Sequence, residues 1–392
     1  MIAPISEQER IERSKRAFEF VNEDVDALVL FDDQYVQYYS GFIFSQTERP
    51  IGLIIWRDGT RTLFVPRLER EHAQETTGVE EVFDYPEYPG KKHPMLILVE
   101  KLRAGGAHRI GVDHDGYPLV AGYIPFPLSP EIEIRFVSPG LDRQMSLKSE
   151  GELALIRESV RWGAEAHRLL QEYTAPGRTE NEVVGQACSE ATAQLELHMG
   201  EGYRKMNRWI PGALAIYRGQ IGANSALPHA LANNARFKEG DTLVTGAGAD
   251  IWGYLSELER TMFIGEPSAE QRRYFGHMMN LQEIAFEAMK PGVACSVVDK
   301  KVRAYYEREN LWDGWRHHVG HSLGQRIHES PFLDIGDDRP LEPTMVFSIE
   351  PGIYVPGLGG FRHSDTVVVT DDGIEILTQY PREIEDLIIP VS

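Results

Sequence analysis

The stretch "MVFSIEPGIYVPGLGGFRHSDTVVVT" (residues 345–370) combines strand-like apolar runs with glycine turns, and it has a counterpart earlier in the chain. The counterpart is "DTLVTGAGADIWGYLSELERTMFIG" (241–265). Each stretch comes after a segment with Pro-Gly, a short polar run and an amphipathic helical pattern, at residues 175–191 and 290–306. Two α-α-β-β halves that face each other would place their inner strands around one central cleft. A chance similarity between two helix–strand segments is the alternative.

The first 140 or so residues follow a different pattern, in which strands and helices alternate. Residues 26–31, 51–56, 62–65 and 109–113 are short and rich in β-branched residues, which predicts strands. Residues 7–22 and 93–105 have helical spacing. The sequence therefore predicts an α/β domain over residues 1–145 and a second domain over residues 146–392.

The second domain is predicted to open with one long amphipathic helix. Its apolar positions repeat at steps of three and four residues, at Leu153, Ile156, Val160, Ala164 and His167. The helix that follows begins with Thr179 and Glu182, the spacing of a capping box.

Composition excludes several classes of function. The chain has 392 residues, 42% of them hydrophobic, and a formal net charge of -20. Such an acidic balance argues against nucleic acid as a partner, because phosphate binding needs clustered Lys and Arg. No apolar run is long enough for a membrane span and the N-terminus lacks a secretory pattern, so we expect a cytoplasmic protein.

Histidines gather beside glycines in two segments. His229 lies in the loop-like stretch 222–241, where a structural or solvated histidine is the alternative to a functional one. The stretch "HHVGHSLGQRIHE" (317–329) holds His317, His321 and His328. Burying such rings without partners costs a few kcal/mol each, which favours a binding or catalytic site over a core.

Carboxylates occur in strand-like runs of both halves. Glu350 lies in the apolar run "MVFSIEP", where a carboxylate needs a cation or a hydrogen-bond donor. Glu257 and Glu259 in "ELERT" (257–261) point to the same strand face. An exposed charged edge is the alternative for this pair.

Three of these segments together carry a family resemblance. "GANSALPH" (222–229), "GHSLGQRIHESP" (320–331) and "FSIEPGIYVPGLGGFR" (347–362) resemble the pita-bread family of Xaa-Pro peptidases, methionine aminopeptidases and creatinase. The resemblance covers nearly the whole chain. It implies an α/β (α+β) protein: a small N-terminal α/β domain, a C-terminal domain of two pseudo-symmetric α-α-β-β halves, and a homodimer.

The resemblance also bears on metal binding, because peptidases of this family hold two divalent metal ions with two Asp, one His and two Glu. His321 and Glu350 match two of these ligands, and Glu257 stands where the second Asp is expected. Gly246 and Ser364 replace the remaining Asp and Glu, and neither is a good ligand for a divalent ion. We therefore expect no metal cofactor. The alternative is one weakly held ion such as Mn or Zn on Glu257, His321 and Glu350.

One branch of the family, creatinase, works without metal, and "ELERT" is similar to its motif. That similarity implies His229 as the acid/base and Glu259 with Glu350 as the binding groups for a cationic part of the substrate. The stretch "ERPI" (48–51) is similar to another creatinase segment, which implies that Arg49 binds a substrate carboxylate and reaches in from the neighbouring subunit. The residues expected to contact substrate besides Arg49 are His321, His328, Arg362 and His363.

The main hypothesis is thus a metal-independent, creatinase-like hydrolase of a C–N bond in a small molecule, such as an amidinohydrolase. The first alternative is an Xaa-Pro dipeptidase or aminopeptidase P-like peptidase with a reduced metal site. The peptidase-like loops favour it, whereas Gly246 and Ser364 oppose it. The second alternative is a non-catalytic binding protein on the same fold.

Overall fold

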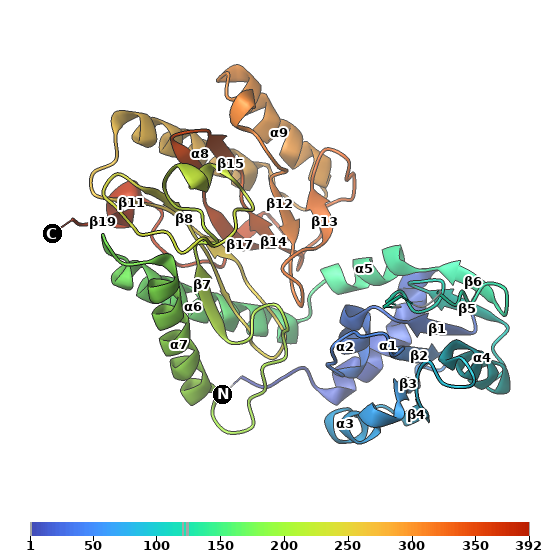
Figure 1. The fold of residues 1–392 in the computed structure, drawn as a ribbon. Helices are drawn as coiled ribbons and strands as arrows, with labels where there is room; N and C mark the ends of the chain where they lie inside the picture. The colour runs from blue at the N-terminus through green and yellow to red at the C-terminus, as the bar shows by residue number, and fades with distance from the viewer. Residues whose placement is uncertain (1, 120, 123–124, 392) are drawn as a thin grey trace. The chain divides into compact units, whose positions relative to one another are not determined.

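The computed structural model describes residues 2–119, 121–122 and 125–391, and its contacts divide the chain into two units (Figure 1). The N-terminal unit comprises residues 5–145. The C-terminal unit comprises residues 2–4 and 146–391.

The N-terminal unit is built on a mixed six-stranded sheet with the order β4-β3-β2-β1-β5-β6. The β1–β2 and β2–β3 pairs are antiparallel, and the β1–β5, β3–β4 and β5–β6 pairs are parallel. The elements are α1 (Glu7–Val21), β1 (Ala27–Leu30), α2 (Asp33–Ser40), β2 (Gly52–Trp56), β3 (Arg61–Pro66), α3 (Arg70–Thr76), β4 (Glu81–Tyr85), α4 (Pro94–Ala104), β5 (Arg109–Val112), β6 (Glu133–Phe136) and α5 (Ser138–Ser146).

Both faces of this sheet are buried, which explains why its central strands are continuous apolar runs. Leu28 and Leu30 of β1 point into a core shared with helices α1 and α2. Ala27 and Val29 point into a second core shared with α4. The strands predicted at 26–31, 51–56, 62–65 and 109–113 are confirmed as β1, β2, β3 and β5.

The C-terminal unit contains the strands that surround the site. Its main sheet runs in the order β13-β12-β14-β17-β10-β9-β7, with β18 paired to β17. The elements are α6 (Glu150–Tyr173), α7 (Glu180–Met199), β7 (Ala213–Ile216), β8 (Thr242–Val244), β9 (Gly246–Ala249), β10 (Leu258–Glu259), β11 (Thr261–Ile264), α8 (Ala269–Ala288), α9 (Cys295–Arg308), β12 (Gly320–Ser322), β13 (Glu329–Leu333), β14 (Val346–Ile349), β15 (Gly352–Val355), β16 (Gly359–Arg362), β17 (Ser364–Val369), β18 (Ile374–Ile376) and β19 (Ile388–Ile389).

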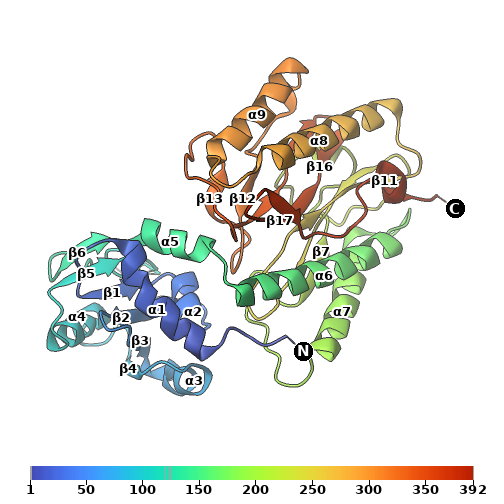
Figure 2. The same cartoon turned by 180° about the vertical axis from the view of Figure 1, so that it is seen from behind.

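Two halves repeat within this unit, as predicted. Helices α6 and α7 precede strands β8–β11, and helices α8 and α9 precede strands β14–β17. Helix α6 packs on α7, β7 and β9, whereas α8 packs on α9, β14 and β15. Figure 2 shows α6 beside α7 and α8 beside α9. Capping boxes begin α6, α7 and α8, and the one predicted at Thr179 and Glu182 is present. No helix in the described residues is long and apolar enough to cross a bilayer.

The register of the main sheet brings the candidate residues onto neighbouring strands. His321 of β12 lies opposite Ser348 of β14. Glu259 of β10 lies opposite Ser364 of β17. Gly246 of β9 lies opposite the last residue of β7. Segments that are far apart in the sequence therefore meet on one curved strand surface.

A buried histidine on α6 makes the stability of this unit depend on pH. His167 is fully buried, its Nε2 lies 2.8 Å from the Thr245 hydroxyl oxygen, and its ring packs on Tyr380. Burial, with a smaller contribution from the charge of Arg260, lowers the pKa of His167 to about 3. In the unfolded chain the pKa returns to about 6.5, so the unfolded state binds more protons between these values.

We expect this histidine alone to remove about 2 kcal/mol of unfolding free energy as the pH falls from about 7 to about 5. The full contribution is present above the unfolded pKa and is lost as the pH falls toward the folded one. The check is a chemical unfolding series over this pH range on wild type and His167→Gln. A variant with the same pH slope as wild type would contradict the assignment.

Candidate metal centre and its pocket

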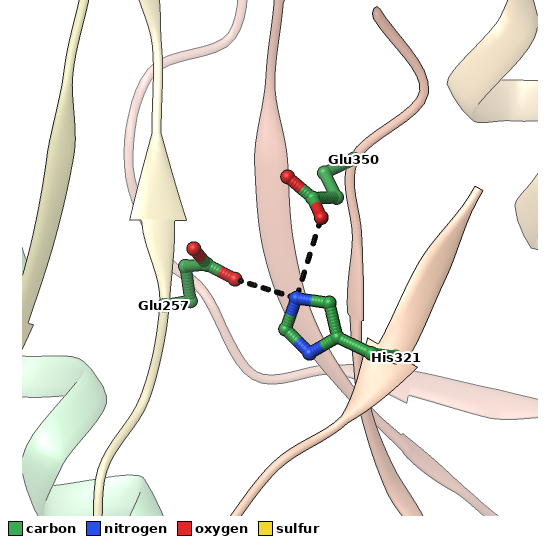
Figure 3. Close-up of side chains that lie close together, drawn as sticks. All are labelled: Glu257, His321 and Glu350. Atoms are coloured by element: carbon green, nitrogen blue, oxygen red, sulfur yellow. Dashed lines mark ion pairs between the residues drawn. The ribbon is translucent and has the colours of Figure 1, made fainter. Parts of the chain in front are cut away.

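Glu257, His321 and Glu350 converge on one point (Figure 3). The His321 Nε2 atom is 3.4 Å from Glu257 Oε2 and 3.3 Å from Glu350 Oε1. All three residues are buried, and one ligand atom from each lies within 4.8 Å of the others. Burial alone would lower the pKa of His321, but the two carboxylates outweigh it and raise that pKa well above its ordinary value.

The donor set fits one divalent ion. Two of the converging atoms, Glu257 Oε2 and His321 Nε2, are buried without a hydrogen-bond partner in the described part of the chain. Buried polar atoms are normally hydrogen-bonded. These two atoms are therefore satisfied only when a cation or a proton lies between the imidazole and the carboxylate. Two carboxylates and one imidazole suit ions such as Mn, Zn or Fe.

A second ion has no matching ligands at the positions where the family resemblance places them. The Ser364 hydroxyl is hydrogen-bonded to the Ser348 hydroxyl, with 2.5 Å between the oxygens. A Cβ atom on Gly246 would lie 3.6 Å from Glu259 Oε1 and 3.7 Å from the guanidinium carbon of Arg218. The space beside Gly246 is therefore filled by an ion pair and not by a carboxylate ligand.

That ion pair is part of a buried cluster centred on Glu259. Arg362 donates from Nε to Glu259 Oε2 and from Nη2 to Oε1 at 2.6 Å. The Nη2 atom of Arg218 also donates to Glu259 Oε1, at 2.8 Å. Burial raises the pKa of Glu259 to about 7, against the opposing effect of Arg362. Two guanidinium groups thus share one carboxylate next to the triad of Glu257, His321 and Glu350.

A hydrogen-bonded chain fixes the orientation of Arg362. Its Nη1 atom donates to the Tyr354 hydroxyl at 2.8 Å, and that hydroxyl oxygen lies 2.7 Å from His317 Nε2. His317 Nδ1 lies 2.9 Å from the backbone carbonyl of His318, so Nδ1 carries the proton and Nε2 accepts from Tyr354. Burial lowers the pKa of His317, which agrees with a neutral ring.

Glu257 and Glu350 of the triad, together with the cluster around Glu259, face a cavity of about 420 Å³. Such a volume holds a small molecule or a short peptide. His229 lies on its wall, is exposed, and has no hydrogen bond in the described residues. His328 also lines the cavity, and its ring stacks on that of His321 with 4.0 Å between the centroids. The full lining is Arg218, Pro228, His229, Glu257, Glu259, Arg316, His317, His318, His328, Glu350 and Arg362.

Three residues with predicted substrate contacts do not line the cavity. His321 is fully buried between Glu257 and Glu350. His363 is fully buried, with its ring edge against Phe275, and does not line the cavity. Arg49 belongs to the N-terminal unit, where it pairs with Glu48 at 2.7 Å and Glu87 at 2.9 Å. Its predicted role across a subunit boundary stays a prediction.

Arg218 and Tyr354 were not anticipated from the sequence. Arg218 stands outside every segment that carries the family resemblance, and Glu259, its partner, is 41 positions away. Tyr354 lies inside "FSIEPGIYVPGLGGFR", but nothing in that motif shows that its hydroxyl joins Arg362 to His317. Only a partner search for the buried charge of Glu259 could have suggested a second arginine.

Comparisons with known proteins place these features in context. Residues 154–371 match the model of metallopeptidase family M24, and residues 10–121 match that of the creatinase/prolidase N-terminal domain. The protein named "Probable dipeptidase PepE" of Mycobacterium tuberculosis (strain ATCC 25618 / H37Rv) is 30% identical over 348 residues, which are 88% of this chain and 87% of that protein.

Solved structures agree along almost the whole chain. Dipeptidase PepE from Mycobacterium ulcerans has a TM-score of 0.81 and 25% identity, covering 99% of this chain and 100% of that one. The prolidase from Pyrococcus horikoshii OT3 has a TM-score of 0.75 and 25% identity, covering 96% of this chain and 99% of that one. The prediction of a pita-bread fold with a small N-terminal domain is confirmed.

These comparisons correct two expectations from the sequence. The main hypothesis of a creatinase-like amidinohydrolase is wrong, because the similar proteins are named dipeptidases and prolidases and the matching family consists of metallopeptidases. The geometry agrees, since Arg362 and Arg218 already neutralise the Glu259 carboxylate that was expected to bind a cationic substrate. The expectation of no metal cofactor is wrong for the same family reason, and Glu257, His321 and Glu350 form a candidate site.

Proposed function

We propose, from the premise that this chain belongs to metallopeptidase family M24, that it is an Xaa-Pro dipeptidase which works with one divalent metal ion. As a member of that family the chain is a hydrolase of the peptidase class. The observation that supports a single ion is the convergence of Glu257, His321 and Glu350 beside a cavity that suits a dipeptide and that Glu257 and Glu350 line. The names of the similar proteins support the Xaa-Pro substrate class.

The metal would be held by Glu257, His321 and Glu350. A divalent ion held there would supply Lewis-acid polarisation of the scissile carbonyl and would lower the pKa of an adjacent water molecule. The two carboxylates supply negative charge and the neutral imidazole supplies a nitrogen ligand, a set that borderline ions accept. The strand register, the Ser322 backbone carbonyl 3.1 Å from Nδ1 and the stacked ring of His328 hold the His321 imidazole in place.

His229 is the group best placed to move a proton. Its imidazole is on the cavity wall and makes no hydrogen bond within the described residues, so both ring nitrogens are free to meet the substrate. An imidazole can both accept and return a proton. In the proposal it delivers a proton to the nitrogen of the leaving imino acid.

The basic side chains orient the substrate. Arg362 keeps its position through Glu259 and the Tyr354 hydroxyl, so its guanidinium does not move with the ligand. Arg316 stands at the same cavity and is held only by the backbone carbonyls of Asp313 and Trp315 in the described chain. These positive charges favour a small substrate with a free carboxylate over the middle of a long peptide chain.

The homodimer with Arg49 at the neighbouring site and the cytoplasmic location remain part of this proposal. The acidic net charge of -20 and the small cavity support a small-molecule substrate and no nucleic acid. Light scattering on the purified protein measures the dimer directly.

Hydrolysis of Ala-Pro and Gly-Pro by the metal-depleted protein, before and after one of Mn, Zn, Co or Fe is added, tests the function. The expected result is release of proline only after a metal is restored, with Ala-Ala and longer Xaa-Pro peptides cleaved far more slowly. Absence of proline release with every metal, in protein that has demonstrably bound the ion, would contradict the proposal.

A further inference from the structure

Arg218 reaches the site from an unusual backbone conformation. It comes two residues after the end of β7, and its φ angle is +54°. Residues other than glycine rarely adopt this left-handed backbone region, because Cβ crowds the backbone. The next residue, Gly219, donates its N–H to Glu180 Oε1 at 2.6 Å, which fixes the turn. Residues held in such conformations concentrate at functional sites.

The turn places the Arg218 guanidinium in the space that a family metal ligand would occupy. The Arg218 Nη2 atom donates to Glu259 Oε1 at 2.8 Å and to Gln220 Oε1 at 3.3 Å. Its guanidinium carbon lies 3.7 Å from where a Cβ atom on Gly246 would be. Gly246 is the position where the family resemblance predicts an aspartate ligand of the second ion. A larger residue there would press against the arginine.

The guanidinium is only partly satisfied by the protein. Arg218 Nε is buried and has no hydrogen-bond partner in the described residues. The side chain as a whole is 35% exposed and lines the cavity together with Glu257, Glu350 and His229. A buried donor at a ligand cavity, beside an anchor that fixes its plane, points to an acceptor that arrives with the ligand.

We propose that Arg218 replaces the second metal ion of the family's dinuclear site and binds a carboxylate of the substrate. Glu259 and Gln220 accept hydrogen bonds from Nη2, and the Nε–H that they leave unpaired donates to the substrate oxygen. A planar guanidinium matches a carboxylate better than an ammonium group does, so lysine is a poor substitute. The assignment of the carboxylate to a dipeptide rests on the proposed function, whereas the carboxylate-binding role of Arg218 does not.

Binding measurements separate this role from catalysis. Isothermal titration of Gly-Pro and of Gly-prolinamide is compared in wild type, Arg218→Ala, Arg218→Lys and Arg157→Ala. Arg157 is a matched control because it pairs with Glu375 on the surface, outside the cavity lining. We expect wild type and Arg157→Ala to prefer the acid over the amide by about tenfold or more, and Arg218→Ala to lose that preference. Arg218→Lys keeps only a part of it. An undiminished preference in Arg218→Ala overturns the proposal.

A second measurement needs neither a dipeptide nor turnover. The Nε–H resonance of Arg218 is identified in the ¹⁵N NMR spectrum by its loss in Arg218→Lys, and acetate is then titrated into wild type. We expect this resonance to shift in a saturable way. A shift combined with no dipeptide hydrolysis would refute the proposed function and keep the inference. No shift would refute the inference whatever the enzyme cleaves.

Discussion

His321→Ala abolishes stable metal binding, and the kcat/KM for Ala-Pro falls by about a thousandfold or more. The imidazole is the one nitrogen ligand of the triad and lies between the two carboxylates, 3.4 Å from Glu257 and 3.3 Å from Glu350. Without it the remaining carboxylates face each other with no group between them, and metal affinity falls by about 100-fold or more. Metal affinity is measured by competition with a fluorescent chelator, and activity by proline release.

The control for this variant is His198→Ala, the same substitution at a half-exposed histidine on α7 that lies outside the cavity lining. It should leave metal affinity and kcat/KM within about twofold of wild type. If His321→Ala retained both metal and activity while folded, the triad would not be the metal site.

Arg362→Met lowers the free energy of unfolding of the C-terminal unit by about 3–5 kcal/mol. Arg362 and Glu259 are both almost fully buried, and Arg362 contributes two of the three hydrogen bonds that the Glu259 carboxylate accepts from arginines. Removing the arginine leaves a buried charge with only Arg218 to compensate it. Urea unfolding followed by tryptophan fluorescence measures the change.

The double variant Glu259→Gln/Arg362→Met distinguishes pairing from packing. Because the buried charge is removed together with its partner, the double variant should be more stable than Arg362→Met alone. Additive losses from the two substitutions would show that the contacts are independent, and the cluster would then not be the ion pair that the structure describes.

Much of the fold follows from local apolar patterning. The central strands of the N-terminal sheet are buried on both faces, so β1, β2, β3 and β5 are conspicuous as apolar runs. The two strands that the sequence does not reveal, β4 and β6, are the outer strands of that sheet. They carry acidic or basic residues such as Glu81, Glu133 and Arg135, because an edge strand faces solvent and need not be apolar.

The site is harder to read from the sequence because its chemistry depends on contacts between strands. The family pattern names Glu257, His321 and Glu350 as possible ligands, and the structure brings the three together. The pattern also draws attention to the two missing carboxylates, which led to the wrong expectation of a metal-free site. The sequence does not show that Arg218 neutralises Glu259, since a side-chain pair across 41 positions has no local signal.

The metal content of the purified protein tests the central claim most directly. Protein prepared without chelators is equilibrated with Mn, Zn, Co or Fe, passed through a desalting column and measured by inductively coupled plasma mass spectrometry. The structure predicts about one equivalent of one metal, lost in a Glu257→Gln/Glu350→Gln variant. Two equivalents in wild type, or less than about a tenth of an equivalent of every metal, would contradict the single-ion site.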